Sequence, residues 1–224
     1  MKLVVVTGRP GTGKTTLCRE LAELARARGL TVRGLLTVAP PADEGPDAAP
    51  GVRRRLEDPA ADGPGVQRRL EDLASGEQRL LGSEVPLEQR HPGDPRWRLV
   101  DDTLAWGDAV LCAACPTDVL IVDEAGPVEL LHQRGWLAGI RRALGGPYAL
   151  AAVVVRPWLV QRFLDVVELE PEAAVPVIID VEGPGAAAVM DGYLKQVGAD
   201  RTATIGREST DGNVVAPAST AVSA

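Results

Sequence analysis

The stretch that most constrains this chain is a glycine-rich segment near its N-terminus, Gly8-Arg9-Pro10-Gly11-Thr12-Gly13-Lys14-Thr15. It matches the pattern G-x-x-x-x-G-K-[ST] of a phosphate-binding loop, the Walker A motif or P-loop, at every fixed position. The apolar, β-branched run 3–7 before it is typical of a buried parallel strand. Residues 16–25 after it place their leucines on one helical face. A strand, a glycine loop and a helix are the three parts that such an anion site needs.

The residue types of the loop explain how it would hold phosphate. Glycines let the backbone turn successive N–H groups inward, and the helix N-terminus adds about half a positive charge behind them. Lys14 would reach the β- and γ-phosphates, and the Thr15 hydroxyl could ligate Mg²⁺. The predicted nucleotide-binding residues are Gly8, Arg9, Pro10, Gly11, Thr12, Gly13, Lys14, Thr15 and Thr16.

A second landmark is Val119-Leu120-Ile121-Val122-Asp123-Glu124, an apolar run that ends in two carboxylates. It predicts a buried parallel strand, and ligand sites of open α/β sheets lie at the C-terminal ends of such strands. We expect Asp123 to hold Mg²⁺ together with Thr15, as in a Walker B motif. Glu124 is placed to orient and deprotonate an attacking water. The acidic pair therefore favours hydrolysis over simple docking of a phosphate chain.

The length and the net charge of the chain limit the classes of protein to which it can belong. The chain has 224 residues, which suits one α/β domain with an appendage, and a formal net charge of −7. This acidic balance argues against broad binding of nucleic acid or anionic membranes. No apolar run approaches the ~20 residues of a membrane span, and no signal-peptide pattern precedes the first strand. We therefore expect a cytoplasmic protein without a membrane partner.

The middle of the chain changes composition. Residues 31–38 read as a second strand, whereas residues 39–64 are rich in Pro, Gly, Ala and Asp and are predicted to form a loose insertion. Residues 51–58 recur almost unchanged as residues 65–72, which indicates a tandem duplication with one copy in the regular fold. The second copy leads through a glycine turn into residues 78–81. It therefore predicts a β-hairpin over residues 65–82.

The duplicated segment is also rich in arginine, at 53–55 and at 68–69. These side chains could form a basic patch, but the acidic residues beside them favour an ordinary solvated face. Trp97 and Trp106 are interpreted as packing residues rather than as platforms for nucleotide bases. The Cys112/Cys115 pair has the spacing of a zinc or redox site, but the sequence has no second pair and only two histidines. We interpret these cysteines as packing residues near a helix end.

The remaining elements alternate helix and strand. Helices are predicted over 99–112, 130–144, 157–167 and 186–197, and strands over 149–155 and 175–181. The first of these strands delivers Arg156 at its C-terminal end, and Pro176 suggests that the last strand starts there or lies at a sheet edge. From residue 200 onward the composition predicts a disordered tail, so the NTPase domain would span residues 1–199.

Two strings carry a resemblance to a known family. The segment 7–16 and Asp123-Glu124-Ala125-Gly126-Pro127-Val128-Glu129-Leu130 resemble the small P-loop nucleoside-triphosphatases first described from thermophiles, which are RecA/AAA+-like proteins. The P-loop alone is shared by a very wide superfamily, whereas the second string is typical of far fewer proteins. The resemblance covers about residues 1–181 without 39–64. It implies a three-layer α/β fold with a central, mostly parallel sheet, in which the Arg156 strand lies between the P-loop strand and the Asp123 strand.

The resemblance also implies an activity, the Mg²⁺-dependent hydrolysis of several nucleoside triphosphates. In that reaction Lys14 and the loop N–H groups would neutralise the γ-phosphoryl charge, and Arg156 would stabilise the leaving charge. Glu129 would contact Glu124 or Arg156 without touching the substrate itself. One departure is Glu182-Gly183-Pro184-Gly185, which stands where the family has a polar Asn-Arg segment.

Two alternatives stay open at this point. A nucleotide or nucleoside kinase would use the same loop to pass phosphate to a small acceptor. A nucleotide-dependent switch or chaperone would use slow hydrolysis to bind and release a partner protein. The preferred base and the choice between monomer and homo-oligomer are not readable from these residues.

Overall fold

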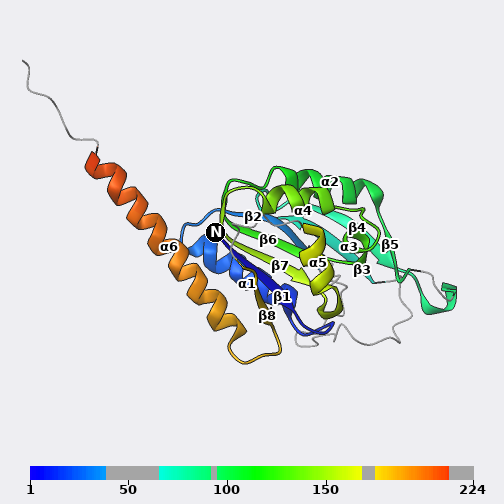
Figure 1. Ribbon diagram of the computed structural model, residues 1–224. Coiled ribbons are helices and arrows are strands. Elements are labelled where there is room, and N and C mark those ends of the chain that lie inside the picture. Colours follow the sequence, from blue (N-terminus) through cyan, green and yellow to red (C-terminus); the bar gives the residue numbers. More distant parts are fainter. Residues whose placement is uncertain (39–65, 92–94, 168–174, 212–224) are drawn as a thin grey trace, which may run out of the picture.

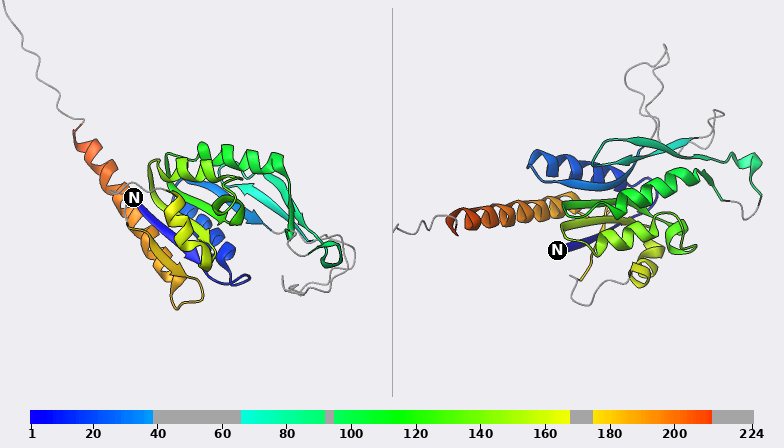
Figure 2. Two further views of the ribbon diagram at one scale, coloured as in Figure 1. Left: turned by 45° about the vertical axis from the view of Figure 1, so that its right-hand side comes forward. Right: turned by 90° about the horizontal axis from the view of Figure 1, so that it is seen from above.

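The computed structural model describes residues 1–38, 66–91, 95–167 and 175–211. Eight strands form one mixed sheet in the order β5-β4-β3-β2-β6-β7-β1-β8 (Figure 1). Helices cover both faces of this sheet, so the predicted three-layer fold is confirmed (Figure 2). The predicted insertion at 39–64, with the first copy of the duplication, lies outside the described residues.

Five neighbouring strands run parallel. They are β1 (Lys2–Thr7), β2 (Val32–Val38), β6 (Thr117–Ala125), β7 (Tyr148–Val155) and β8 (Val177–Asp180). Their cores are continuous apolar runs because helices bury both of their faces. β7 lies between β1 and β6, as the family resemblance predicted, and β8 forms the sheet edge that Pro176 indicated.

The other three strands extend the sheet beyond β2, and each runs antiparallel to the strand before it. They are β3 (Gln67–Asp72), β4 (Gln78–Glu84) and the short β5 (Trp97–Leu99). The second copy of the duplication forms β3, and the predicted hairpin is present. Asp72 caps its turn by accepting hydrogen bonds from the Ala74 N–H and the Ser75 hydroxyl, and Gly76 adopts φ 75°. A short 3-10 turn, η1 (Leu87–Gln89), follows the hairpin.

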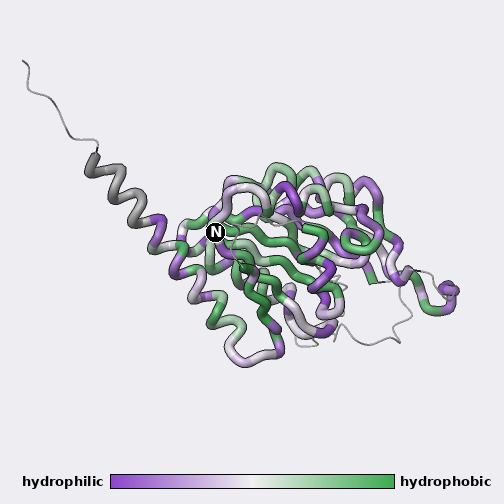
Figure 3. Tube along the Cα trace, in the orientation of Figure 1, coloured by the Kyte–Doolittle hydropathy of each residue, from purple (hydrophilic) through white to green (hydrophobic). Residues whose placement is uncertain are grey.

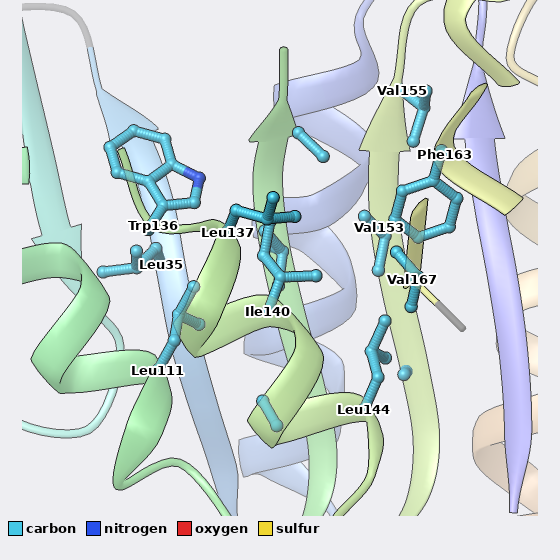
Figure 4. Close-up of a cluster of buried hydrophobic side chains, with 14 of the residues drawn as sticks. Leu35, Leu111, Trp136, Leu137, Ile140, Leu144, Val153, Val155, Phe163 and Val167 are labelled. Carbon is cyan, nitrogen blue, oxygen red and sulfur yellow. The ribbon is translucent and has the colours of Figure 1, made fainter. Parts of the chain in front are cut away.

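The helices form one layer on each face. One layer holds α1 (Lys14–Ala27) and α6 (Ala186–Asp211), which pack on apolar side chains of β1, β2, β6 and β7. The opposite layer holds α2 (Asp101–Cys112), α4 (Leu137–Leu144) and α5 (Val160–Val167), with the short α3 (Pro127–Leu130) and η2 (Pro157–Leu159). In that layer, leucines of α2 and α4 meet Trp136, and Phe163 of α5 packs over β7 (Figure 4).

Two predicted helix boundaries in this layer were wrong. The helix expected over 130–144 is split into α3 and α4, because Gln133 and Gly135 between them adopt φ 51° and 63°, which no α-helix accommodates. The helix expected from residue 99 begins at Asp101, because Leu99 pairs with Gly82 in β5.

The C-terminal helix is longer than predicted. α6 continues to Asp211 and leaves the body of the domain in its second half, so the stretch 200–211, expected to be disordered, is helical (Figure 1). Part of the reason lies in Arg201, which donates to the Gly29 carbonyl (2.9 Å) and to the Asp118 carboxylate (2.8 Å). These contacts hold the part of the helix that follows Val197 against Gly29, just before β2, and Asp118, at the start of β6. Residues 212–224 lie outside the described part of the chain.

Among the helices that the structure describes, none is both long and apolar enough to cross a membrane.

The thiols of Cys112 and Cys115 are both free. Cys112 ends α2, and the Cys115 thiol donates a hydrogen bond to the Ala143 carbonyl at 3.2 Å. Within the described ranges no three His, Cys, Asp or Glu side chains gather as a metal-binding group.

Candidate phosphate-binding and hydrolytic site

The P-loop joins β1 to α1 at the carboxyl edge of the sheet. Gly8 adopts φ 142°, and a Cβ there would lie 2.7 Å from Val181 and 2.9 Å from the Thr12 hydroxyl. The fold therefore needs glycine at this position for both reasons, the positive φ and the close packing. Gly13 adopts φ 93° as the N-cap of α1, and the nine predicted nucleotide-binding residues form one continuous loop and first helical turn.

Lys14 lies over the loop that precedes it. Its Nζ donates to the carbonyls of Gly8 (2.9 Å) and Arg9 (2.6 Å), and the Thr12 hydroxyl donates to the same Arg9 carbonyl (2.8 Å). Partial burial lowers the pKa of the Lys14 ammonium, while the carboxylates of Glu124 and Asp123 oppose that shift. The lysine and the acidic pair are therefore close enough to interact through their charges.

Asp123 is buried at the end of β6 beside α1. It is 3% exposed and accepts hydrogen bonds from the Thr15 side chain and from the Thr37 N–H (3.3 Å). Burial raises the pKa of Asp123 to about 6, and these two hydrogen bonds counteract the rise. Thr37, at the end of β2, also donates its hydroxyl to the Asp123 carbonyl at 2.6 Å. The structure thus brings together Thr15 and Asp123, the two predicted metal ligands.

Glu124 and Arg156 form an ion pair across neighbouring strands. The Arg156 Nε lies 2.6 Å from the Glu124 Oε1, and the side chains are 43% and 25% exposed respectively. The Trp136 indole N–H donates to the Glu124 carbonyl at 3.3 Å. Arg156 thus fixes the direction of the Glu124 carboxylate, while a share of both side chains stays open to solvent.

Glu129 lies beneath the turn that follows the acidic pair. Its Oε2 accepts the Gly126 N–H at 3.0 Å and so caps α3, and a Cβ at position 135 would collide with its Oε1. Burial raises the pKa of Glu129 to about 7. Its carboxyl accepts hydrogen bonds from backbone N–H groups of Gly126, Glu129 and Trp136, so it supports the backbone that follows Glu124.

Glu182 joins the last strand to the P-loop. Its carboxylate accepts the Arg9 main-chain N–H (3.1 Å) and the Arg9 guanidinium (2.6 Å from Nη2). The guanidinium holds the pKa of the Glu182 carboxyl below its usual value. The segment in which this chain departs from the family thus contacts the start of the P-loop.

Sequence reasoning missed three contributors to this edge of the sheet. Thr37 could have been noticed as a polar residue at the C-terminal end of a predicted strand. Glu182 was noted only as a departure from the family, and its contact with Arg9 had no sequence signal because the two residues are 173 positions apart. Arg68 is exposed, as its interpretation as part of a solvated face predicted, yet its charge also interacts with Asp123 and Glu124. Only the pairing of β3 with β2 brings it there.

The chain resembles known proteins over most of its length. A family model described as an AAA domain matches residues 1–144. Nucleoside-triphosphatase THEP1 of Methanopyrus kandleri is 32% identical over 141 residues, which cover 62% of this chain and 66% of that protein. The protein of the same name from Methanothermobacter thermautotrophicus is 30% identical over 159 residues, or 70% and 78% of the two chains.

Solved structures show the same fold at lower identity. A human cancer-related nucleoside triphosphatase and THEP1 from Aquifex aeolicus each match with a TM-score of 0.57, at 20% and 19% identity. The matches cover 88% of this chain and 97% and 99% of those structures. At these identities the likeness concerns the arrangement of the sheet and helices.

Proposed function

The chain belongs to the nucleoside-triphosphatase THEP1 family, and we propose that it hydrolyses nucleoside triphosphates to the diphosphate and phosphate in a Mg²⁺-dependent reaction. The observation that carries the proposal is the meeting of the P-loop with the acidic end of β6. The Thr15 side chain is hydrogen-bonded to Asp123, and Glu124 stands next to it with a partly exposed carboxylate. The predicted phosphate loop, the two predicted metal ligands and a second acid therefore lie at one edge of the sheet.

The residues at this edge fit a magnesium ion. The Thr15 hydroxyl and the Asp123 carboxylate are oxygen ligands, and Mg²⁺ is commonly held by one or two carboxylates plus water and substrate phosphates. Asp123 is buried, so a cation would also compensate a carboxylate that burial otherwise disfavours. When bound, the ion would neutralise negative charge on the β- and γ-phosphates.

The remaining chemistry falls to side chains of this chain. Glu124 would orient the attacking water and accept its proton, and Arg156 would hold that carboxylate in position through the 2.6 Å contact. Lys14 and the main-chain N–H groups of the loop would stabilise the charge on the transferred phosphoryl group. Glu129 would keep the turn after Glu124 rigid by capping α3.

We propose ATP, GTP and the other common nucleoside triphosphates as substrates. Most of the contacts assigned above go to phosphate oxygens, which every triphosphate shares. The sequence also lacks the Asn-Lys-x-Asp string that reads guanine, so it gives no reason to favour GTP.

The test is phosphate release from ATP, GTP, CTP and UTP, with Mg²⁺ and with EDTA, for the wild type and for Lys14→Ala. We expect release from all four without any acceptor, its loss in EDTA, and a drop of about 10³-fold in the variant. Release that depends strictly on a small acceptor would instead indicate a kinase. Tight nucleotide binding without turnover would indicate a switch protein.

A further inference from the structure

One basic side chain at the edge of the site has no role in the chemistry proposed above. Arg68 lies near the start of β3, in a sequence stretch that looked like a solvated face. We propose that Arg68 is a further catalytic residue, which binds the γ-phosphate of the bound triphosphate from the side of the β-hairpin. This inference rests on the proposed function and assigns a new residue to it.

The register of the sheet places Arg68 at the carboxyl edge. Arg69 pairs with Val38, and Leu70 pairs with Thr37, the residue that donates two hydrogen bonds to Asp123. Because β3 runs antiparallel to β2, its first residues lie beside the last residues of the parallel strands. Side chains of a strand alternate between faces, so Arg68 shares a face with Leu70, which packs in the α2–α4 layer. Glu124 follows Leu120 and Val122 of that same layer.

Trp97 holds the Arg68 side chain in place. The Arg68 Cζ lies 4.6 Å from the centroid of the Trp97 ring, which β5 brings next to the hairpin. A guanidinium held against an aromatic face is stabilised without the use of its N–H groups, and these remain available for a planar fork of hydrogen bonds to phosphate. The short strand β5 thus positions the ring against which the Arg68 guanidinium packs.

Arg68 has charged neighbours of both signs but no ion pair among the described residues. Glu124, Asp123, Arg96 and Arg156 are all close enough to influence it. Arg156 is paired with Glu124 (2.6 Å), and Arg96 is paired with Glu84 (2.7 Å). Among the described residues Arg68 makes no ion pair of its own. Glu124 and Asp123 act on Arg68 more strongly than the two other arginines do, so the guanidinium keeps the charge with which it would bind a phosphate.

The experiment compares binding of a triphosphate with binding of a diphosphate. Dissociation constants for the β,γ-imido analogues of ATP and GTP, and for ADP and GDP, are measured with Mg²⁺ for the wild type, Arg68→Ala and Arg69→Ala. Arg69 is the matched control, since it points to the other face and donates to the Gln78 carbonyl. We expect Arg68→Ala to weaken the triphosphate analogues about tenfold or more and the diphosphates by less than about threefold.

Turnover provides the second readout. An arginine that contacts the transferred phosphoryl group commonly contributes about 10³-fold or more to the rate, so kcat of Arg68→Ala should fall by at least about 10²-fold while Arg69→Ala stays near the wild type. Trp97→Leu should reduce kcat, and Trp97→Phe should restore much of it by keeping a ring under the guanidinium. Thermal melting curves confirm that each variant is folded.

The outcomes separate the two proposals. An active wild type with an equally active Arg68→Ala, or with equal losses for triphosphate and diphosphate, overturns the role of Arg68 alone. A wild type that neither binds nor hydrolyses any triphosphate overturns the proposed function, and this inference falls with it.

Discussion

The two halves of the sheet are built on different principles. The parallel half, β2-β6-β7-β1-β8, is apolar along its central strands, and Val4, Ile121 and Val153 are fully buried. The antiparallel half, β3-β4-β5, is mostly exposed or half-buried, with Leu70 and Leu81 buried, and hydrophilic residues recur along its strands (Figure 3). The parallel half supplies the P-loop and both acids, whereas the antiparallel half supplies Arg68 on a surface that looks unremarkable in sequence. The difference shows that a strand can contribute to a site through its register alone.

The largest expected effect lies in the parallel half. Glu124→Gln should lower kcat by about 10²- to 10⁴-fold while nucleotide affinity changes little, because the amide cannot accept the proton of the attacking water. Phosphate release and equilibrium binding on the same preparation measure the two quantities. Turnover at the wild-type rate would remove Glu124 from the chemistry.

A substitution at Leu70 tests how the antiparallel half of the sheet packs against helix α2. It is fully buried and meets Gly107 of α2, where an added Cβ would lie 2.9 Å from the Leu70 side chain. Leu70→Ala should therefore lower the free energy of unfolding by about 2–5 kcal/mol. Leu80→Ala on the next strand, at a position 36% exposed, should cost less than about 1 kcal/mol. Urea denaturation of both variants makes the comparison, and equal losses would contradict the packing described.

Glu129 gives the turn of the parallel half a pH dependence. Burial raises its pKa from an ordinary 4.5 to about 7, so the folded protein holds this proton more tightly than the unfolded chain does. The resulting stabilisation is fully present below about pH 4.5, is lost as the pH rises to about 7, and amounts to about 3 kcal/mol.

Glu129→Gln should remove this contribution while keeping an acceptor for the Gly126 N–H. The free energy of unfolding of the variant should therefore fall less than that of the wild type between pH 4.5 and 7.5. Urea denaturation across this range measures both curves. If they run parallel, Glu129 does not titrate as its burial implies.

The smallest expected effect concerns the edge strand β8. Glu182→Gln removes the charge that pairs with Arg9, but that guanidinium is 79% exposed and screened by water. KM for the triphosphate should change by less than about fivefold, and the change should shrink in high salt. Measuring KM at low and high ionic strength decides this, and a large salt-independent change would make Glu182 part of the site itself.

The sequence by itself determined the parallel half of this protein. The string from Gly8 to Thr15 predicted a strand, loop and helix, and the structure contains them because glycine and lysine at fixed spacing leave the backbone few alternatives. The run before Asp123 predicted β6 because a strand buried on both faces must be apolar throughout. The hairpin followed from its turn chemistry, and the family followed from the string that begins at Asp123.

Only the tertiary structure decided what surrounds these motifs. The register between β3 and β2 decides whether the exposed Arg68 side chain lies on the face of Glu124, since a shift of one residue would turn it to the other face. The split between α3 and α4 follows from left-handed residues at 133 and 135, and α6 is tied to the domain as far as Arg201 by its contact with Asp118, 83 positions earlier in the chain. Such long-range pairings leave no pattern in the local sequence, so they could not be predicted. The P-loop itself could be predicted from the eight residues Gly8 to Thr15.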